Sequence, residues 1–249
     1  MGNSIIIKNL KKSYNGSEVF SNLNLKIKRG KITAFFGTNG SGKSTLFNII
    51  SGAIIKDDGE IIIEGFDRSK FSYMFQNYSE SLLPWRKNFD NIALPLQINL
   101  ISKENIKKQI DNLYNKYGFK INLNSYPYTL SGGQKQFLLF LRSIITNPNI
   151  LLLDEPFSSL DYENSILLSN KLQEYYISTK STILVITHDI EEAVYLADEI
   201  VVLSHKPTKV LGIVKNTLPY PRNLDMLKSI EFNKIKSNVL KLFQSEVKL

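Results

Sequence analysis

Short apolar runs separated by turn residues characterise the beginning of the chain. Residues 5–7 are all isoleucine and residues 23–27 alternate apolar and polar side chains, so we expect a strand at each position. The sequence Tyr-Asn-Gly at residues 14–16 predicts a turn between them. A further strand is expected at residues 61–63, after the turn at residues 57–59. These segments predict several short strands joined by turns.

A second pattern alternates buried strands with helices. Continuous apolar runs of four to six residues are typical of strands that are covered on both faces. Strand–helix–strand alternation predicts parallel strands with right-handed crossovers, and therefore an α/β fold. The strands and helices of this pattern are expected at residues 31–36, 44–51, 150–153, 163–176, 182–187 and 190–197.

The middle and the end of the chain have a helical pattern. Residues from about 84 to 147 are helical and loop-rich, and residues 103–117 predict an amphipathic helix. Residues 223–249 are rich in lysine and predict one or two more helices. The middle of the chain therefore differs in pattern from the strand-rich segments on either side of it.

Composition narrows the possible chemistry. The 249 residues are 43% hydrophobic and 22% charged, which is typical of a globular protein. The chain contains no cysteine, which excludes disulfides, thiolate metal sites and a cysteine nucleophile. The lack of cysteine also fits a reducing cytosol.

The net charge of +8 leaves several partners open: nucleic acid, an anionic membrane surface, an acidic protein, or none if the charges are merely dispersed. No block of five or six basic residues occurs, so we do not expect a nucleic-acid-binding arm. No signal peptide is expected at the N-terminus, and no run approaches the roughly 20 apolar residues that cross a bilayer. We therefore expect a soluble chain that reaches a membrane only through a partner.

A glycine-rich segment between a predicted strand and a predicted helix has the pattern of a phosphate-binding loop. Glycines let backbone N–H groups approach an anion, and the following helix presents its positive end to the same anion. Lys43 would contact the terminal phosphates and the Ser44 hydroxyl would bind Mg²⁺. The alternative is a glycine-rich turn that binds nothing. The expected nucleotide-binding residues are Gly37, Thr38, Asn39, Gly40, Ser41, Gly42, Lys43, Ser44 and Thr45.

Two carboxylates, Asp154 and Glu155, follow the buried strand at residues 150–153. The carboxyl ends of parallel strands are where α/β sheets bind ligands. We expect Asp154 to help hold Mg²⁺ and Glu155 to accept a proton from the attacking water. The alternative for this pair is a helix cap, because aspartate is a favoured capping residue.

The sequence Leu-Ser-Gly-Gly-Gln at residues 130–134, upstream of the acidic pair, resembles the signature motif of the ATP-binding cassette ATPases. The resemblance covers roughly residues 5–220. It implies an α/β fold with a phosphate-loop NTPase (RecA-like) core, an N-terminal antiparallel β subdomain and an inserted α-helical subdomain. It also implies a homodimer that holds two ATP molecules between the phosphate loop of one chain and the signature of the other. The signature residues expected to bind nucleotide are Ser131, Gly132, Gly133 and Gln134.

Four further residues resemble family motifs. Gln76 resembles the glutamine that contacts Mg²⁺ and the attacking water, and His188 resembles the histidine that contacts the γ-phosphate. Asp161 resembles the loop that crosses the dimer interface, and Tyr14 resembles the aromatic residue that stacks on adenine. Their respective alternatives are a loop glutamine, a satisfied histidine at a strand end, a helix cap and a hairpin aromatic. The other histidine, His205, matches no motif, and we expect it at the surface.

Within the family, residues 74–76, 82–85, 91–96 and 188–198 resemble importers of the nitrate, sulfonate, taurine and bicarbonate type. This resemblance implies two transmembrane permease subunits, a substrate-binding protein, no nucleic acid, and a place on the cytoplasmic face of the membrane. An importer of another small organic solute, such as a thiamin-precursor pyrimidine, stays open. A soluble cassette ATPase that acts on nucleic acid also stays open, although such relatives usually carry two cassettes or a long coiled coil.

The expected division of the chain is an ATPase domain at residues 1–220 and a helical extension at residues 221–249. Within the ATPase domain, residues 1–83 and 148–220 form the core with its β subdomain, and residues 84–147 form the helical subdomain. Trp85 is expected to be exposed on a partner-binding surface, with a core position as the alternative. Phe137 stands where the family usually has arginine, and small alanines are frequent in the family at the positions of Leu138, Leu139, Phe140, Leu141 and Ser143. These differences predict altered packing behind the signature, while Arg142 is retained.

Overall fold

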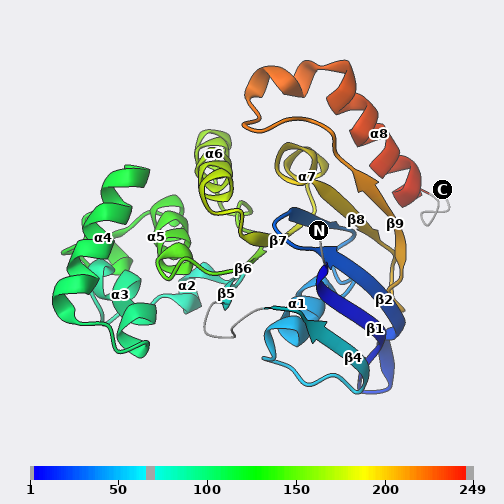
Figure 1. The fold of residues 1–249 in the computed structure, drawn as a ribbon, viewed down its shortest axis with the longest axis horizontal. Coiled ribbons are helices and arrows are strands. Elements are labelled where there is room, and N and C mark those ends of the chain that lie inside the picture. The colour runs from blue at the N-terminus through cyan, green and yellow to red at the C-terminus, as the bar shows by residue number, and fades with distance from the viewer. Residues whose placement is uncertain (1–2, 66–70, 245–249) are drawn as a thin grey trace.

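Two β-sheets lie side by side in the computed structural model, which describes residues 3–65 and 71–244 (Figure 1). The first sheet is antiparallel, has the order β2-β1-β4, and consists of β1 (Asn3–Tyr14), β2 (Ser17–Lys28) and β4 (Asp58–Ile63). The second has the order β5-β6-β7-β3-β8-β9, and only β9 runs antiparallel to its neighbour. Its strands are β3 (Ile32–Phe36), β5 (Phe71–Met74), β6 (Ile150–Asp154), β7 (Thr182–Thr187), β8 (Glu199–Leu203) and β9 (Val210–Lys215).

The helices gather in two places. Helices α3, α4 and α5 form a group at one end of the molecule, and α8 runs beside β9 at the opposite end (Figure 1). The segments in chain order are α1 (Lys43–Ser51), α2 (Tyr78–Ser81), α3 (Asn88–Ile98), α4 (Lys103–Tyr117), the 3₁₀ helix η2 (Pro127–Thr129), α5 (Gly132–Ile144), α6 (Tyr162–Thr179), α7 (Ile190–Leu196), η3 (Leu224–Lys228) and α8 (Ile230–Gln244). No helix in residues 3–65 or 71–244 combines the length and the apolar character needed to span a bilayer.

The fold is α/β, as predicted, and several elements have the expected bounds. The helix at residues 103–117 and the strand at residues 182–187 begin and end where the pattern places them. Strands β1 and β2 are 12 residues each, much longer than their apolar runs, because bulges interrupt the alternation along β1. The end of the predicted C-terminal helix, residues 245–249, lies outside the described residues.

Three strands of the second sheet, β5, β8 and β9, were not predicted. Strand β5 is only four residues long and partly exposed at the sheet edge, so it has no extended apolar run. Strand β9 forms the other edge and has a mostly half-buried pattern. Edge strands are covered less completely, and their sequence signal is therefore weaker than that of central strands, which accounts for β5 and β9. Strand β8 is an internal strand that is buried along its whole length, so this reason does not apply to it.

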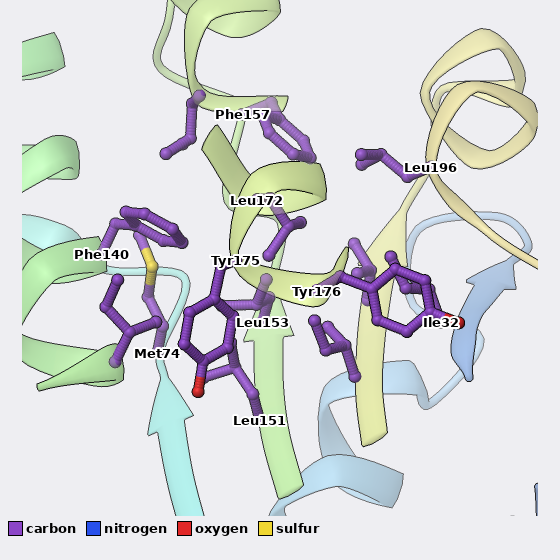
Figure 2. Packing of buried hydrophobic residues seen from close by; sticks show 14 of the residues in the cluster. Ile32, Met74, Phe140, Leu151, Leu153, Phe157, Leu172, Tyr175, Tyr176 and Leu196 are labelled. Carbon is purple, nitrogen blue, oxygen red and sulfur yellow. The ribbon is translucent and has the colours of Figure 1, made fainter. Parts of the chain in front are cut away.

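Successive residues of the central strands serve two different apolar clusters. In β6, Leu151 and Leu153 belong to a large cluster with α5 and α6, whereas Ile150 and Leu152 belong to a smaller cluster with α1 and the antiparallel sheet. This alternation follows from the two-residue period of a strand. Figure 2 shows Leu153 below Leu172 of α6, with Tyr175 and Tyr176 of the same helix over the sheet. The second sheet is therefore the central layer of the molecule, covered on both faces.

The bulky residues of α5 are accommodated by other aromatic residues. The ring of Phe137 stacks on Phe119 with centroids 4.4 Å apart, and Phe140 packs edge-on against Tyr117 at 5.9 Å. The last turn of α5 is tied to a neighbouring segment, because Arg142 Nη1 donates to the Ser81 carbonyl at 2.7 Å. Helix α5 therefore packs through large side chains along its buried face.

Candidate functional site

The predicted phosphate loop connects β3 to α1 at the centre of the second sheet. Gly42 has φ of 89° and stands directly before α1. A Cβ at Gly42 would lie 2.6 Å from Val19 Cγ1, so a larger residue would clash as well as strain the backbone. At the other end of the loop, a Cβ at Gly37 would lie 3.1 Å from the Leu203 carbonyl oxygen. The loop therefore follows a path that requires glycine at position 42.

Lys43 points back into the loop that precedes it. Its Nζ donates to the carbonyl oxygens of Gly37 and Thr38 at 2.9 and 2.8 Å, and only 5% of the residue is exposed. Burial lowers the pKa of Lys43, while the charges of Glu155 and Asp154 act in the opposite direction. The ammonium group is thus held at the loop, between backbone carbonyls and two carboxylates.

Asp154 is the last residue of β6 and is almost completely buried. Tyr73 donates its hydroxyl to Asp154 Oδ2 at 3.2 Å, and Oδ1 has no hydrogen-bond partner among the residues that the structure describes. Burial raises the pKa of Asp154, and the nearby Ser44 and Tyr73 hydroxyls oppose this shift. A buried carboxylate oxygen without a partner, beside the Ser44 hydroxyl, has the chemistry that Mg²⁺ prefers.

Three predicted catalytic residues, Gln76, Glu155 and His188, lie close together. Glu155 is the residue after Asp154. Gln76 Nε2 donates to Glu155 Oε2 at 3.0 Å, and His188 Nδ1 lies 3.5 Å from Glu155 Oε1. Glu155 has φ of 48°, and its backbone N–H donates to the Ile186 carbonyl of β7. Glu155 is therefore tied to the edge of the sheet, and its carboxylate faces an amide from one segment and an imidazole from another.

The predicted signature residues begin α5. Ser131 caps the helix, its Oγ accepting from the Gln134 N–H, and the Gln134 side chain accepts from the Ser131 N–H in return. Gln134 also donates to the Lys120 carbonyl at 3.1 Å. This capping box satisfies two backbone groups, so the N-terminus of α5 is ordered within the chain.

Asp161 is the N-terminal cap of α6, which is the alternative role considered for it in the sequence. Its Oδ1 accepts from the Asn164 N–H at 2.8 Å and its Oδ2 from the Asn164 side chain at 3.0 Å. The preceding Leu160 lies against the signature, since a Cβ at Gly133 would be 3.3 Å from its Cδ2. The structure thus brings the loop at residues 159–161 next to the signature helix.

Tyr14 lies at the end of β1 and is 42% exposed, with Lys12 Nζ 5.1 Å from the ring centroid. An exposed ring is available for stacking, and the adenine contact stays a prediction.

Trp85 is 72% exposed, as expected, so the alternative that it lies in the core is wrong.

Two residues outside the phosphate-loop motif contact the loop, and no sequence pattern indicates these contacts. His205 is exposed, as predicted, yet its Nδ1 lies 3.2 Å from Thr38 Oγ1. Thr208 donates its hydroxyl to the Ser41 carbonyl. Both residues belong to the connection between β8 and β9, which were not predicted, so nothing indicated that this connection reaches the loop.

Comparison with known proteins shows the family to which the chain belongs. The family model described as ABC transporter matches residues 20–158. The aliphatic sulfonates import ATP-binding protein SsuB of Bacillus cereus is 36% identical over 232 residues, which cover 91% of this chain and 89% of that protein. The taurine import ATP-binding protein TauB of Escherichia coli O157:H7 is 37% identical over 209 residues, covering 82% of this chain and 81% of TauB.

Among solved structures, the post-hydrolysis dimer of the ATP-binding cassette MJ0796 bound to ADP and Pi has a TM-score of 0.75 and 28% identity. It covers 85% of this chain and 98% of that one. The family model spans more than half of the chain, and the similar import proteins match it nearly end to end. The chain therefore belongs to the ABC transporter family, and it is an ATPase of the ATP-binding cassette type.

Proposed function

We propose that this chain is the ATP-hydrolysing subunit of an importer for a small anion or small organic solute of the nitrate, sulfonate, taurine or bicarbonate type. The observation that carries the proposal is the meeting of Gln76, Glu155 and His188 beside a buried Asp154 and the phosphate loop. The direction of transport is supported by the import proteins for sulfonates and taurine that this chain resembles.

We propose that the phosphate loop binds the phosphates of ATP through its backbone amides and Lys43, while Tyr14 stacks on the adenine. Ser44, Asp154 and Gln76 would hold Mg²⁺, which supplies charge neutralisation on the phosphates when it is bound. The partnerless Oδ1 of Asp154 and the adjoining Ser44 hydroxyl fit such a cation.

In this proposal, Glu155 accepts a proton from the water that attacks the γ-phosphate. The carboxylate is only 12% exposed, and two polar side chains fix its direction. Gln76 restrains one oxygen and His188 lies beside the other, so the carboxylate is held in one position for accepting the proton. His188, whose side chain is 54% exposed, is free to contact the γ-phosphate as well.

We propose that two copies of the chain close on two nucleotides. Ser131 and Gln134 bond to each other's backbone N–H groups, and Gln134 also bonds to the Lys120 carbonyl, so the start of α5 is ordered within the chain. Its exposed N-terminus, with the amides of Gly132 and Gly133, would face the nucleotide of a second copy. Asp161, on the loop beside this helix, would lie at the same interface. A ligand shared between two chains makes their association depend on that ligand.

We propose that two permease subunits dock on the exposed surface around Trp85, and that a substrate-binding protein delivers the solute to them. Phe75 and Trp85 are 44% and 72% exposed, and a hollow is lined by Leu83, two residues before Trp85, together with Pro95 of α3 and Arg142 of α5. Large exposed apolar side chains of this kind are frequent at partner interfaces. The chain would then work on the cytoplasmic face of the membrane, without binding nucleic acid.

We further propose the division into an ATPase domain at residues 1–220 and an extension at residues 221–249. Residues 84–147 hold α3, α4, η2 and α5, and the extension holds η3 and α8. Helix α8 packs Phe232, Ile235 and Val239 into the large apolar cluster, so the extension is anchored to the ATPase domain.

The test is uptake in cells that lack this gene, measured with labelled taurine, an aliphatic sulfonate, nitrate, bicarbonate and a thiamin-precursor pyrimidine. Uptake of one solute should fall on deletion and return with the wild-type chain but not with Glu155→Gln. If only uptake of the pyrimidine fell on deletion, the solute class proposed here would be wrong and the pyrimidine would replace it. Unchanged uptake of every solute, together with salt-sensitive nucleic-acid binding by the purified chain, would favour the soluble ATPase instead.

A further inference from the structure

The connection between β8 and β9, residues 204–209, lies against the phosphate loop. Thr208 is 1% exposed and donates its hydroxyl to the Ser41 carbonyl. His205 Nδ1 lies 3.2 Å from Thr38 Oγ1. Leu203, at the end of β8, approaches Gly37, whose Cβ position is 3.3 Å from Leu203 Cβ. Residues 204–209 thus contact the loop at Thr38 and Ser41, and the end of β8 contacts it at Gly37.

The segment is itself held in one conformation. The Ser204 N–H donates to the Lys209 carbonyl at 3.0 Å, and the Lys209 N–H donates to Ser204 Oγ at 2.8 Å. The Thr208 N–H donates to the Val19 carbonyl of β2 at 2.8 Å. The Thr208 hydroxyl is therefore presented by a braced segment rather than by a free loop.

The contact at Ser41 determines where a neighbouring amide points. The Ser41 carbonyl and the Gly42 N–H belong to one planar trans peptide, so they point in opposite directions. Gly42 has φ of 89° and no side chain, and such a residue offers little resistance to rotation of this peptide. A hydrogen bond that holds the carbonyl toward Thr208 keeps the N–H on the opposite side, where a phosphate-binding loop needs its donors.

We infer that residues 204–209 hold the phosphate loop in its anion-binding shape, with Thr208 as a positioning residue through Ser41 and His205 as a second one through Thr38. The inference rests on the proposed role of this loop in binding ATP, and it adds residues that no loop motif contains. Thr208 does not touch the nucleotide; it acts by fixing the peptide that does.

The experiment compares Thr208→Val, which removes the hydroxyl at nearly constant shape, with Thr208→Ser, which keeps it. Thr182→Val is the matched control, because Thr182 is equally buried and its hydroxyl accepts from the Gly30 N–H away from the loop. ADP affinity by calorimetry, KM and kcat for ATP, and melting temperature are measured for each variant.

Thr208→Val should weaken ADP binding and raise KM by about threefold to tenfold, the effect of one hydrogen bond, with kcat changed by less than about twofold. Thr208→Ser should bind ADP like the wild type, and Thr182→Val should lower the melting temperature without weakening ADP binding. If Thr208→Val bound ADP like the wild type and melted at the same temperature as Thr182→Val, the inference would be wrong. The hydrogen bond between Thr208 and Ser41 would then have only a structural role.

If Thr208→Val does not fold, His205→Ala carries the same comparison, with a loss of ADP affinity expected and an unchanged affinity contradicting the inference. Failure of the inference is distinguishable from failure of the proposed function, because ADP affinity is measured without any transport. A chain that imports none of the labelled solutes would still show the difference between valine and serine at position 208.

Discussion

The side-chain amide of Gln76 donates a hydrogen bond to the carboxylate of Glu155, with 3.0 Å between Nε2 and Oε2. The two residues come from segments that are far apart in the sequence and on neighbouring strands, because Gln76 follows β5 and Glu155 follows β6. Parallel pairing places the carboxyl ends of both strands at one edge of the sheet. The same pairing of β6 with β7 brings His188 to this edge, so sheet topology assembles the proposed catalytic group.

Replacing Glu155 by Gln should lower ATP hydrolysis by about 10² to 10⁴-fold, because the amide cannot accept the proton of the attacking water. ATP affinity should stay close to that of the wild type, since the phosphate loop is unchanged. Phosphate release and equilibrium dialysis with ATP measure the two effects. Glu163→Gln in the first turn of α6 is the control, and hydrolysis by Glu155→Gln at the rate of this control would remove Glu155 from the proposed role.

The Glu155→Gln variant should also form an ATP-dependent dimer, because slow hydrolysis preserves the shared ligand. Gel filtration with ATP should show twice the mass of the 28.4 kDa chain, and no ATP should return the single chain. Adding Ser131→Arg at the exposed N-terminus of α5 should abolish the dimer while each chain still binds ATP. A dimer that tolerates this arginine would mean that the signature helix does not face the second nucleotide.

Gly42→Ala should destabilise the chain and weaken nucleotide binding. An alanine at φ of 89° costs about 1 to 2 kcal/mol in backbone strain, and its Cβ would also meet Val19 Cγ1 at 2.6 Å. Gly16→Ala is a matched control, since Gly16 has φ of 79° but no atom near its Cβ position. Urea unfolding should show a larger loss in the free energy of unfolding for Gly42→Ala than for Gly16→Ala. Equal losses would show that the contact with Val19 is readily relaxed.

The pH dependence of stability should report on Glu192. Burial raises the pKa of Glu192 to about 7 from its ordinary value of 4.5, against the hydrogen bond from Thr187. The folded chain therefore binds a proton that the unfolded chain has lost, so the contribution to stability is complete below pH 4.5 and is lost as the pH rises to about 7. Urea unfolding at intervals across this window should show a smaller decline for Glu192→Gln than for the wild type. If the free energy of unfolding declined equally in Glu192→Gln and the wild type, the Glu192 carboxylate would be in contact with water and its pKa would not be raised.

Trp85→Ala should separate hydrolysis from transport. The side chain is 72% exposed, so its loss should leave the folding and the ATPase activity of the isolated chain unchanged. Binding to the permease should weaken by about 30-fold or more if Trp85 is a central contact, the equivalent of about 2 kcal/mol. Trp85 is the only tryptophan, and its fluorescence should shift to shorter wavelength when the permease covers it. Tyr162→Ala, at a similarly exposed aromatic residue on α6, is the control.

The parts of the fold that were predictable are those specified by local pattern. The helix at residues 103–117 has an apolar stripe and a serine cap, and β7 is buried along its whole length. The phosphate loop and the acidic pair were found because their chemistry requires particular residue types at fixed spacing. Their identification did not require knowledge of distant contacts.

Apart from the buried strand β8, the parts that were missed depend on contacts between distant segments. Strand β5 is a strand because it pairs with β6, and its four residues carry little pattern of their own. The packing of Phe137 depends on Phe119, which lies in the loop after α4. His205 was expected at the surface and is exposed, but its contact with Thr38 requires the β8–β9 connection to fold over the loop. Local sequence does not specify such contacts.

Helix α5 has a consequence for how force travels through the molecule. Its 13 residues form a rod of about 20 Å, since a helix rises about 1.5 Å per residue. One end carries the Ser131 cap, and the last turn holds the Ser81 carbonyl through Arg142, four residues from Trp85. If a second copy closes on the capped end as proposed, a rod of this length would carry the displacement to the Ser81 backbone. In this way nucleotide-driven closure would be converted into mechanical work on the permease.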